Sequence, residues 1–244
     1  MMNQTISTPE TEVKPFSRYA KAAAGLALAA AVTLPKRAAA VVNPPLTFAQ
    51  IPGTGDTKVL NYALALEALE ADLYVQALQR LTTGGNANSL GVQITGLGLS
   101  ASEPDVRYTQ LFGRVEREHR DFLIQALGTN SLLLSAPFNT AKFDFSMNNL
   151  SRQQVVNLLY TVENLGVSAY LGAIPFFVTN TFLLVAGGIQ ATEARHTATI
   201  AYIYNKLFAA TFPISPPANV NNGIDPLIAP DVVLQAASQF IVLG

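Results

Sequence analysis

Residues 115–120 of the chain read VEREHR and residues 192–196 read TEARH, so each stretch contains Glu-x-x-His. Residues three apart in an α-helix lie on one face about one turn apart, which lets a carboxylate and an imidazole converge on one point. The chain has only two histidines, and each follows a glutamate by three positions. The two pairs, Glu116 with His119 and Glu193 with His196, are therefore predicted metal ligands. The alternative for either histidine alone is a hydrogen-bonded core residue.

The composition narrows the kinds of protein and of site that the chain can form. Half of the 244 residues are hydrophobic and 13% are charged, which is enough apolar material for one large core. The net charge is −1, so no basic surplus favours nucleic acid. The absence of cysteine excludes disulfides, thiolate zinc sites, iron–sulfur clusters and thiol nucleophiles. A metal must then be held by Glu, Asp and His, a donor set that suits iron or manganese and, less specifically, zinc.

Apolar residues at helical spacing predict four long helices. Ser151 can cap the third, because Gln154 three positions later completes a capping box. Pro175 ends or bends that helix. In the fourth helix, the pair 187–188 (Gly-Gly) is expected to act either as a break or as a close contact with a neighbouring helix. The expected helices span residues 57–81, 103–127, 152–173 and 181–210.

Two long connections join these helices. Residues 82–102 form a Gly-, Ser- and Asn-rich loop. Gly128 is expected to stop the second helix, and residues 129–150 connect that helix to the third. The latter segment can traverse a bundle of ~30 Å, because an extended chain covers up to ~3.3 Å per residue. The fold class that follows is all-α: a four-helix bundle built as a helix pair, a long crossover between helices two and three, and a second helix pair, with extended N- and C-terminal segments.

The N-terminal segment has the pattern of an export signal. Basic residues precede a thirteen-residue apolar run, 22–34, and the small residues 38–40 follow it. The run is too short to span a bilayer comfortably, so no stable membrane span is expected. The competing interpretation is an Ala-rich amphipathic helix that stays on the protein, favoured by the basic pair 36–37 just before the cleavage site. Export to the periplasm or cell surface is the expected localisation, and the cytoplasm is the alternative.

The remaining segments lie before and after the bundle in the sequence. Residues 1–40 are the export signal or a disordered segment, and 41–56 are a Pro- and Gly-rich linker. Asp56 or Thr57 can cap the first helix that follows it. The bundle is expected to occupy residues 57–210. Residues 211–244 form a tail in which the apolar segment 232–242 can pack back on the core.

The first and third helices form a weak internal repeat, in which each carries a glutamate at the matching position. Aligned without gaps, residues 66–75 and 162–171 match Glu67 with Glu163 and Tyr74 with Tyr170. Glu163 is the only charged residue between positions 153 and 190. A lone ionised carboxylate in so apolar a run would cost several kcal/mol unless it were paired or bound to metal.

Glu on helix one, Glu-x-x-His on helix two, Glu on helix three and Glu-x-x-His on helix four resemble the ferritin-like di-metal carboxylate proteins, which include rubrerythrins, bacterioferritins and manganese catalases. The sequence around the motifs is most similar to that of the bacterial ferritin-like domain group that contains desiccation-related proteins. The resemblance covers residues 57–210. It implies a ferritin-like bundle and two metal ions, iron or alternatively manganese.

The resemblance also implies a role for each ligand. Glu116 and Glu193 would bridge the two ions, and the terminal ligands would be the remaining four side chains: Glu67, His119, Glu163 and His196. Tyr74 and Tyr170 lie two helical turns from Glu67 and Glu163, where a tyrosine in several family members hydrogen-bonds a ligand; ordinary core packing is the alternative.

Two neighbouring acids compete for these roles. Glu70 lies three residues after Glu67 on nearly the same face and is the alternative ligand of helix one. Glu118 lies ~200° around the helix from Glu116, so it is predicted to face solvent.

The function that the resemblance implies is oxidation of Fe²⁺ with reduction of O₂ or H₂O₂ in oxidative-stress defence. A dimanganese site would instead disproportionate H₂O₂. The small molecules O₂ or H₂O₂ are the expected partners, and the chain could also form a homo-oligomer. The alternative, from a different class, is a non-enzymatic ferritin-like scaffold in desiccation tolerance or surface assembly, with structural or vestigial metal.

Overall fold

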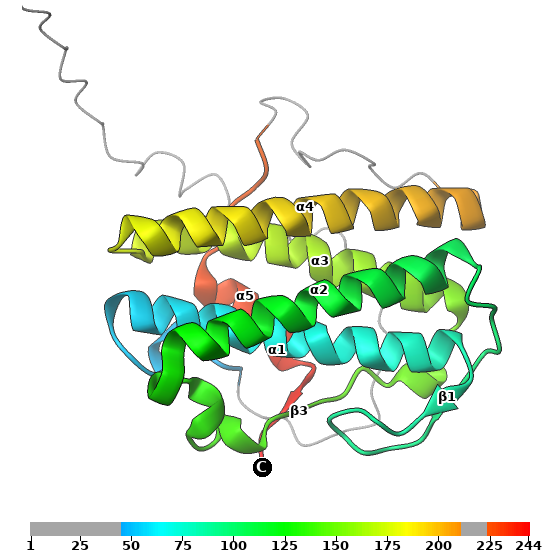
Figure 1. The fold of residues 1–244 in the computed structure, drawn as a ribbon, viewed down its shortest axis with the longest axis horizontal. Coiled ribbons are helices and arrows are strands. Elements are labelled where there is room, and N and C mark those ends of the chain that lie inside the picture. Colours follow the sequence, from blue (N-terminus) through cyan, green and yellow to red (C-terminus); the bar gives the residue numbers. More distant parts are fainter. Residues whose placement is uncertain (1–44, 211–223) are drawn as a thin grey trace, which may run out of the picture. The chain divides into compact units, whose positions relative to one another are not determined.

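The computed structural model describes residues 45–210 and 224–244. The expected export signal, the start of the expected linker and the first part of the expected C-terminal tail, residues 211–223, lie outside these ranges. In the described part, four long helices form an all-α bundle: α1 (Gly55–Leu81), α2 (Pro104–Leu127), α3 (Arg152–Ala173) and α4 (Asn180–Phe208). α1 packs mainly on α2, and α3 on α4, each pair antiparallel (Figure 1). The expected fold class is confirmed, including the crossover, which runs the length of the bundle from the end of α2 to the start of α3 (Figure 1).

The helix ends follow local chemistry. Ser151 accepts a hydrogen bond from the backbone N–H of Gln154, whose side chain returns to the Ser151 backbone, so the predicted capping box begins α3. α2 ends at Gly128, which has the positive φ of 52° that glycine adopts readily. Asp56 does not cap α1. Its carboxylate instead accepts hydrogen bonds from the backbone of Val178 and Thr179 before α4, because the tertiary fold brings that turn beside it.

The expectation for Gly187 and Gly188 is wrong. α4 runs through both residues without a break. A Cβ atom added at either position would meet nothing within 4 Å, so neither glycine makes a close helix contact. Both are exposed, because this side of α4 faces away from the other three helices.

α1 is the central helix of the bundle. Its side chains are buried around most of its circumference, whereas α2 is amphipathic and buries a narrow stripe. α2 and α3 cover α1 within the bundle. The crossover covers another side, where buried Asn61 donates to the Asn130 carbonyl and accepts from the Leu132 backbone N–H.

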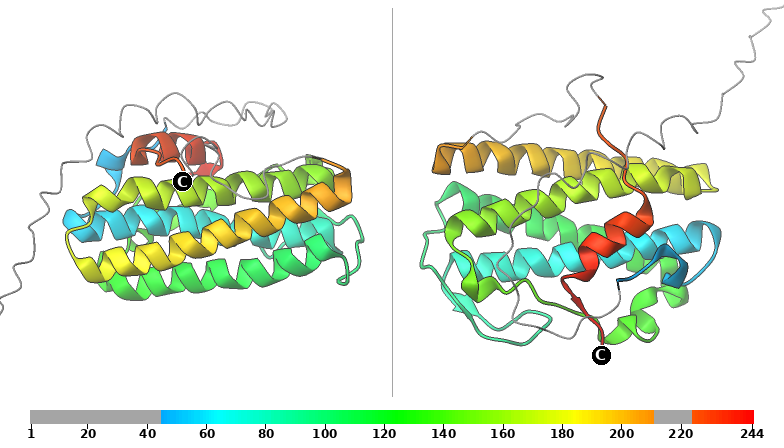
Figure 2. Two further views of the ribbon diagram at one scale, coloured as in Figure 1. Left: turned by 90° about the horizontal axis from the view of Figure 1, so that it is seen from above. Right: turned by 180° about the vertical axis from the view of Figure 1, so that it is seen from behind.

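Short elements close the remaining sides. β1 (Gly84–Gly85) and β2 (Ile94–Thr95) form a small antiparallel hairpin in the loop between α1 and α2. After residue 223 the chain returns as α5 (Pro230–Ser238), with Val233, Leu234 and Ala237 buried. β4 (Ile241–Val242) then pairs with β3 (Lys142–Phe143) of the crossover. Figure 2 shows α5 on the face formed by α1 and α3, away from α2. Among the described helices, none combines the length and the apolar character needed to cross a bilayer.

Candidate metal centre

All six side chains from the repeated motifs meet in the middle of the bundle. α1 contributes Glu67, α3 contributes Glu163, and α2 and α4 contribute their Glu-x-x-His pairs. The four glutamates are completely buried. Helical geometry explains the convergence within each pair, and the antiparallel packing of the pairs brings the four faces to one level.

The ligand atoms form two overlapping groups. In each group, one nitrogen or oxygen atom per residue lies within 4.8 Å of all the others. The first group is Glu67, Glu116, His119 and Glu193, and the second is Glu116, Glu163, Glu193 and His196. The two glutamates from the Glu-x-x-His motifs belong to both groups, whereas each histidine and each remaining glutamate belongs to one.

Glu116 illustrates how a shared carboxylate spans the site. Its Oε2 lies 3.0 Å from His119 Nδ1 and its Oε1 lies 2.8 Å from His196 Nδ1. The other contacts remain local, because Glu67 Oε2 is 3.4 Å from His119 Nδ1 and Glu163 Oε1 is 3.3 Å from His196 Nδ1. Glu116 and Glu193 therefore lie between the two groups.

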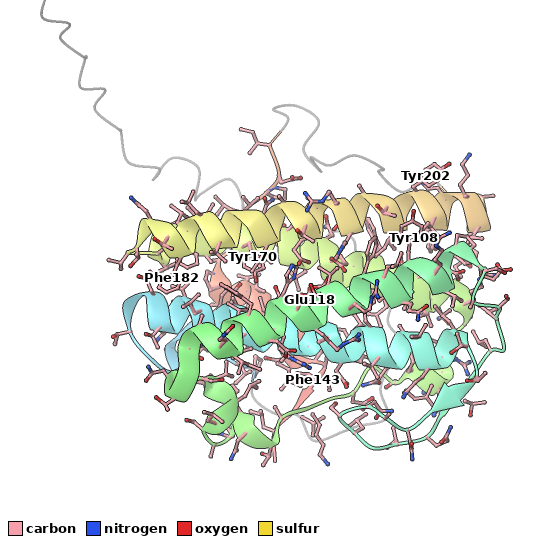
Figure 3. All side chains as sticks on the ribbon, viewed as in Figure 1. Tyr108, Glu118, Phe143, Tyr170, Phe182 and Tyr202 are labelled. Carbon is pink, nitrogen blue, oxygen red and sulfur yellow. The ribbon has the colours of Figure 1, made fainter. Side chains whose placement is uncertain are left out.

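The two tyrosines donate hydrogen bonds to glutamates of the cluster on the opposite helix. Tyr170 on α3 donates to Glu67 Oε1 on α1 over 2.5 Å, and Tyr74 on α1 donates to Glu163 Oε1 on α3. Each tyrosine therefore holds the glutamate of the opposite helix, and not the one on its own helix. Figure 3 shows Tyr170 inside the bundle, and Glu118, which is exposed as predicted, on α2.

Glycine at position 113 makes room for Tyr74. A Cβ atom added to Gly113 on α2 would lie 2.7 Å from the Tyr74 Cβ atom. The side chain of Tyr74 therefore packs directly on the α2 backbone, which the sequence pattern did not indicate. A second contact that the sequence did not reveal is the stack of Phe112 on the His196 ring, with centroids 3.8 Å apart.

The pKa values of the site carboxyl groups show how unfavourable this concentration of negative charge is without cations. Burial raises the pKa of Glu67 to about 7, above its ordinary 4.5, against the opposing hydrogen bond from His119. Burial, together with nearby carboxylates, also raises the pKa of Glu193 and Glu70 well above the usual range. Burial therefore disfavours the ionised form of these three carboxyl groups.

The pKa values of the histidines respond to the same negative charge. Burial alone lowers the pKa of each imidazole, but the surrounding carboxylates outweigh it. Glu116, Glu193 and Glu67 raise the pKa of His119 to about 12, and Glu116 and Glu163 raise that of His196 to about 10. The nearby carboxylates therefore favour the protonated form of both imidazoles.

Unpaired polar atoms provide an independent test of whether the residues fit a metal. Buried polar groups in proteins normally have hydrogen-bond partners. Within the described residues, several buried site atoms form no hydrogen bond of regular geometry, although some lie within 3.5 Å of a histidine nitrogen: Glu67 Oε2, Glu116 Oε1, Glu163 Oε2, both carboxylate oxygens of Glu193, and His196 Nδ1. Oxygen and imidazole donors gathered at one point without partners fit a divalent cation. The cluster can therefore bind a metal ion.

Comparison with known proteins agrees with this geometry. The sequence model of the ferritin-like domain family matches residues 55–206, which is more than half of the chain and contains all six site residues. No curated protein and no solved structure showed significant similarity to the chain. On the family match and the bundle that contains the site, the chain belongs to the ferritin-like domain family.

Proposed function

We propose that the chain binds two iron ions and uses them to oxidise Fe²⁺ while reducing O₂ or H₂O₂, in oxidative-stress defence. The observation that carries the proposal is the pair of overlapping donor groups that share Glu116 and Glu193. The charge also supports it, because four carboxylates balance two divalent cations and leave a neutral cluster in an apolar bundle. Manganese suits the same donors, and a dimanganese site would disproportionate H₂O₂.

The protein side chains have separate tasks in this proposal. Glu67 with His119, and Glu163 with His196, would be the terminal ligands, and Glu116 and Glu193 would be shared between the two ions. When bound, the ions would supply reversible one-electron redox chemistry. Tyr170 and Tyr74 orient the carboxylates of Glu67 and Glu163 through their hydrogen bonds.

A small cavity beside the site supports a small-molecule substrate. It measures about 10 Å³, and its lining extends from partly exposed Tyr108 to Phe112 and Tyr74, the residues that touch His196 and Glu163. A cavity of that size accommodates about one water molecule. Most of the other lining residues are aliphatic, so the cavity favours O₂ or H₂O₂ over an organic substrate.

Metal analysis tests the proposal directly. Protein purified from iron-supplied cells without chelators should contain about two iron ions per chain and consume O₂ or H₂O₂ when supplied with Fe²⁺. The double variant Glu116→Ala, His196→Ala should lose both properties. Glu118→Gln, an exposed change on the same helix, is the matched control and should keep them. Fewer than about one metal ion per chain, with no oxidant consumed, would overturn the proposal and leave a non-enzymatic scaffold.

A further inference from the structure

The ring of Phe112 covers one face of the His196 imidazole. The two ring centroids lie 3.8 Å apart and the planes differ by 22°, so the rings are stacked. The contact joins two helices, because Phe112 belongs to α2 and His196 to α4. Within the described residues, no aromatic ring stacks on His119 in this way. The His196 side chain is 4% exposed and that of His119 is 14% exposed, so one imidazole is covered more closely than the other.

The sequence repeat shows that the covering ring is present in only one half of the bundle. When α2 and α4 are aligned on their Glu-x-x-His motifs, Phe112 is matched by Ile189 and Tyr108 by Val185. Ile189 is buried, but an aliphatic side chain cannot form a ring stack. The two halves therefore offer the same donors to a cation and differ in the residue at this position.

The small cavity beside the site ends at Phe112. Its lining extends from partly exposed Tyr108 to Phe112 and Tyr74, and it includes none of the six ligand residues. Phe112 and Tyr74 therefore separate the cavity from His196 and Glu163. Tyr74 is fixed, because its hydroxyl donates to Glu163 and its Cβ atom packs on the α2 backbone. Phe112 is half-buried and has no hydrogen-bonding group, so its ring is the one that can move.

We propose that Phe112 is a positioning residue that holds the His196 ring and controls access to the cation position near it. A cation or a small oxidant reaches this position from the cavity when the Phe112 ring moves off His196. The position near His119 has no such cover. The inference rests on the proposed function, because it concerns exchange at that metal centre. The two positions have matching donors, yet they should release their ions at different rates.

Proton NMR of the metal-free full-length chain tests the positioning role without any bound ion. The chain has only two histidines, so the imidazole signals of both can be resolved. Protons above the face of an aromatic ring are shifted upfield, and the His196 signals should show this shift. Phe112→Leu should remove the shift, whereas Phe112→Tyr keeps the ring and should retain it. Phe122→Leu, the same change at an exposed position of α2, is the matched control and should leave both imidazoles unchanged.

Release of Co²⁺ into excess chelator, followed by absorption, tests the access role. The wild-type chain should release its two ions in two phases of different rate. Phe112→Leu should accelerate the slow phase by about tenfold or more and leave the fast phase unchanged, because loss of the ring contact lowers the barrier. Phe112→Tyr and Phe122→Leu should both keep the slow phase. Thermal unfolding in chelator checks that each variant folds, and Phe112→Met replaces Phe112→Leu if the latter does not.

Two ligand variants assign the phases to the two positions. His196→Ala should abolish the slow phase, and His119→Ala should abolish the fast one. Release of both ions in one phase, an unchanged slow phase in Phe112→Leu, or an unshifted His196 imidazole in the wild-type chain would overturn the inference. Binding of fewer than two Co²⁺ ions by the wild-type chain would instead overturn the proposed function.

Discussion

The half of the bundle formed by α1 and α2 and the half formed by α3 and α4 carry the same ligand pattern in different surroundings. His119 on α2 is partly exposed, whereas His196 on α4 is nearly sealed beneath Phe112. The repeat matches Phe112 of the first half with Ile189 of the second. The comparison teaches that a sequence repeat determines which donors meet, while the packing of non-repeated neighbours determines the access to each position.

Removal of a shared ligand should have the largest effect, because it acts on both halves at once. Glu116→Ala is expected to weaken cation binding at both positions by more than about 100-fold. This exceeds the loss of affinity of about 10–100-fold that is typical when a residue supporting a ligand is removed. In the metal-free chain the same change should also lower stability, because it removes the buried carboxylate that lies 3.0 Å from His119 Nδ1 and 2.8 Å from His196 Nδ1. Metal content and chelator-competition titrations measure the first effect, and thermal unfolding measures the second. Retention of one tightly bound ion would show that Glu116 serves only one half.

The metal-free chain should lose stability as the pH rises. The pKa of Glu67 is raised from 4.5 to about 7, and those of His196 and His119 are raised from 6.5 to about 10 and about 12. A group whose pKa is raised on folding binds its proton more tightly in the folded state, so its contribution is complete below the ordinary pKa and is lost as the pH passes through the raised value. Stability should therefore fall from about pH 4.5, where Glu67 begins to lose its contribution, to about pH 12, the raised pKa of His119.

The metal-loaded chain provides the contrast. Protons compete with cations for the same donors, so the stabilisation by metal should grow over the same pH interval. Thermal unfolding with chelator and with saturating Co²⁺ measures both trends. A flat profile for the metal-free chain would contradict the raised pKa values.

Each tyrosine hydrogen bond should affect the half that contains its acceptor. Tyr74→Phe removes the donor to Glu163 and should weaken the position near His196 by about 10–100-fold. Tyr170→Phe removes the donor to Glu67 and should weaken the position near His119 by a similar factor. Dissociation constants from chelator competition measure both. Equal losses at both positions in either variant would contradict the assignment of one glutamate to each position.

Two glycines should give the smallest effects, and of opposite sign. Gly187→Ala on α4 meets no neighbouring atom and should stabilise the protein by about 0.5–1 kcal/mol, because glycine loses more backbone freedom on folding. Gly113→Ala on α2 would place its Cβ atom 2.7 Å from the Tyr74 Cβ atom and should destabilise the protein by about 1–3 kcal/mol. Denaturant unfolding measures both. Destabilisation by Gly187→Ala would indicate a contact with another molecule on the exposed face of α4.

Much of the fold could be predicted from local signals. The capping box at Ser151, the stop at Gly128 and the apolar spacing predicted the helix limits closely. The role of Asp56 could not be predicted, because its partners at Val178 and Thr179 are more than a hundred residues away. For the same reason the glycines of α4 were misjudged: a sequence shows a flexible residue, but not which side of its helix remains uncovered.

The candidate site likewise has some features that could be predicted from the sequence and others that only the structure shows. The glutamates and histidines were recognisable from their spacing and from the isolation of Glu163, because both are properties of a single helix. The crossed tyrosine hydrogen bonds, the stack of Phe112 on His196 and the place of Glu70 beside Gly166 each join two helices.

The sequence by itself determined the helices, their order and the six donors, since a period of 3.6 residues places each donor on a face without reference to the rest of the chain. Only the tertiary structure decided which donors share a cation position and which imidazole is sealed. These depend on contacts between side chains far apart in sequence, and such contacts exist only after the helices have packed.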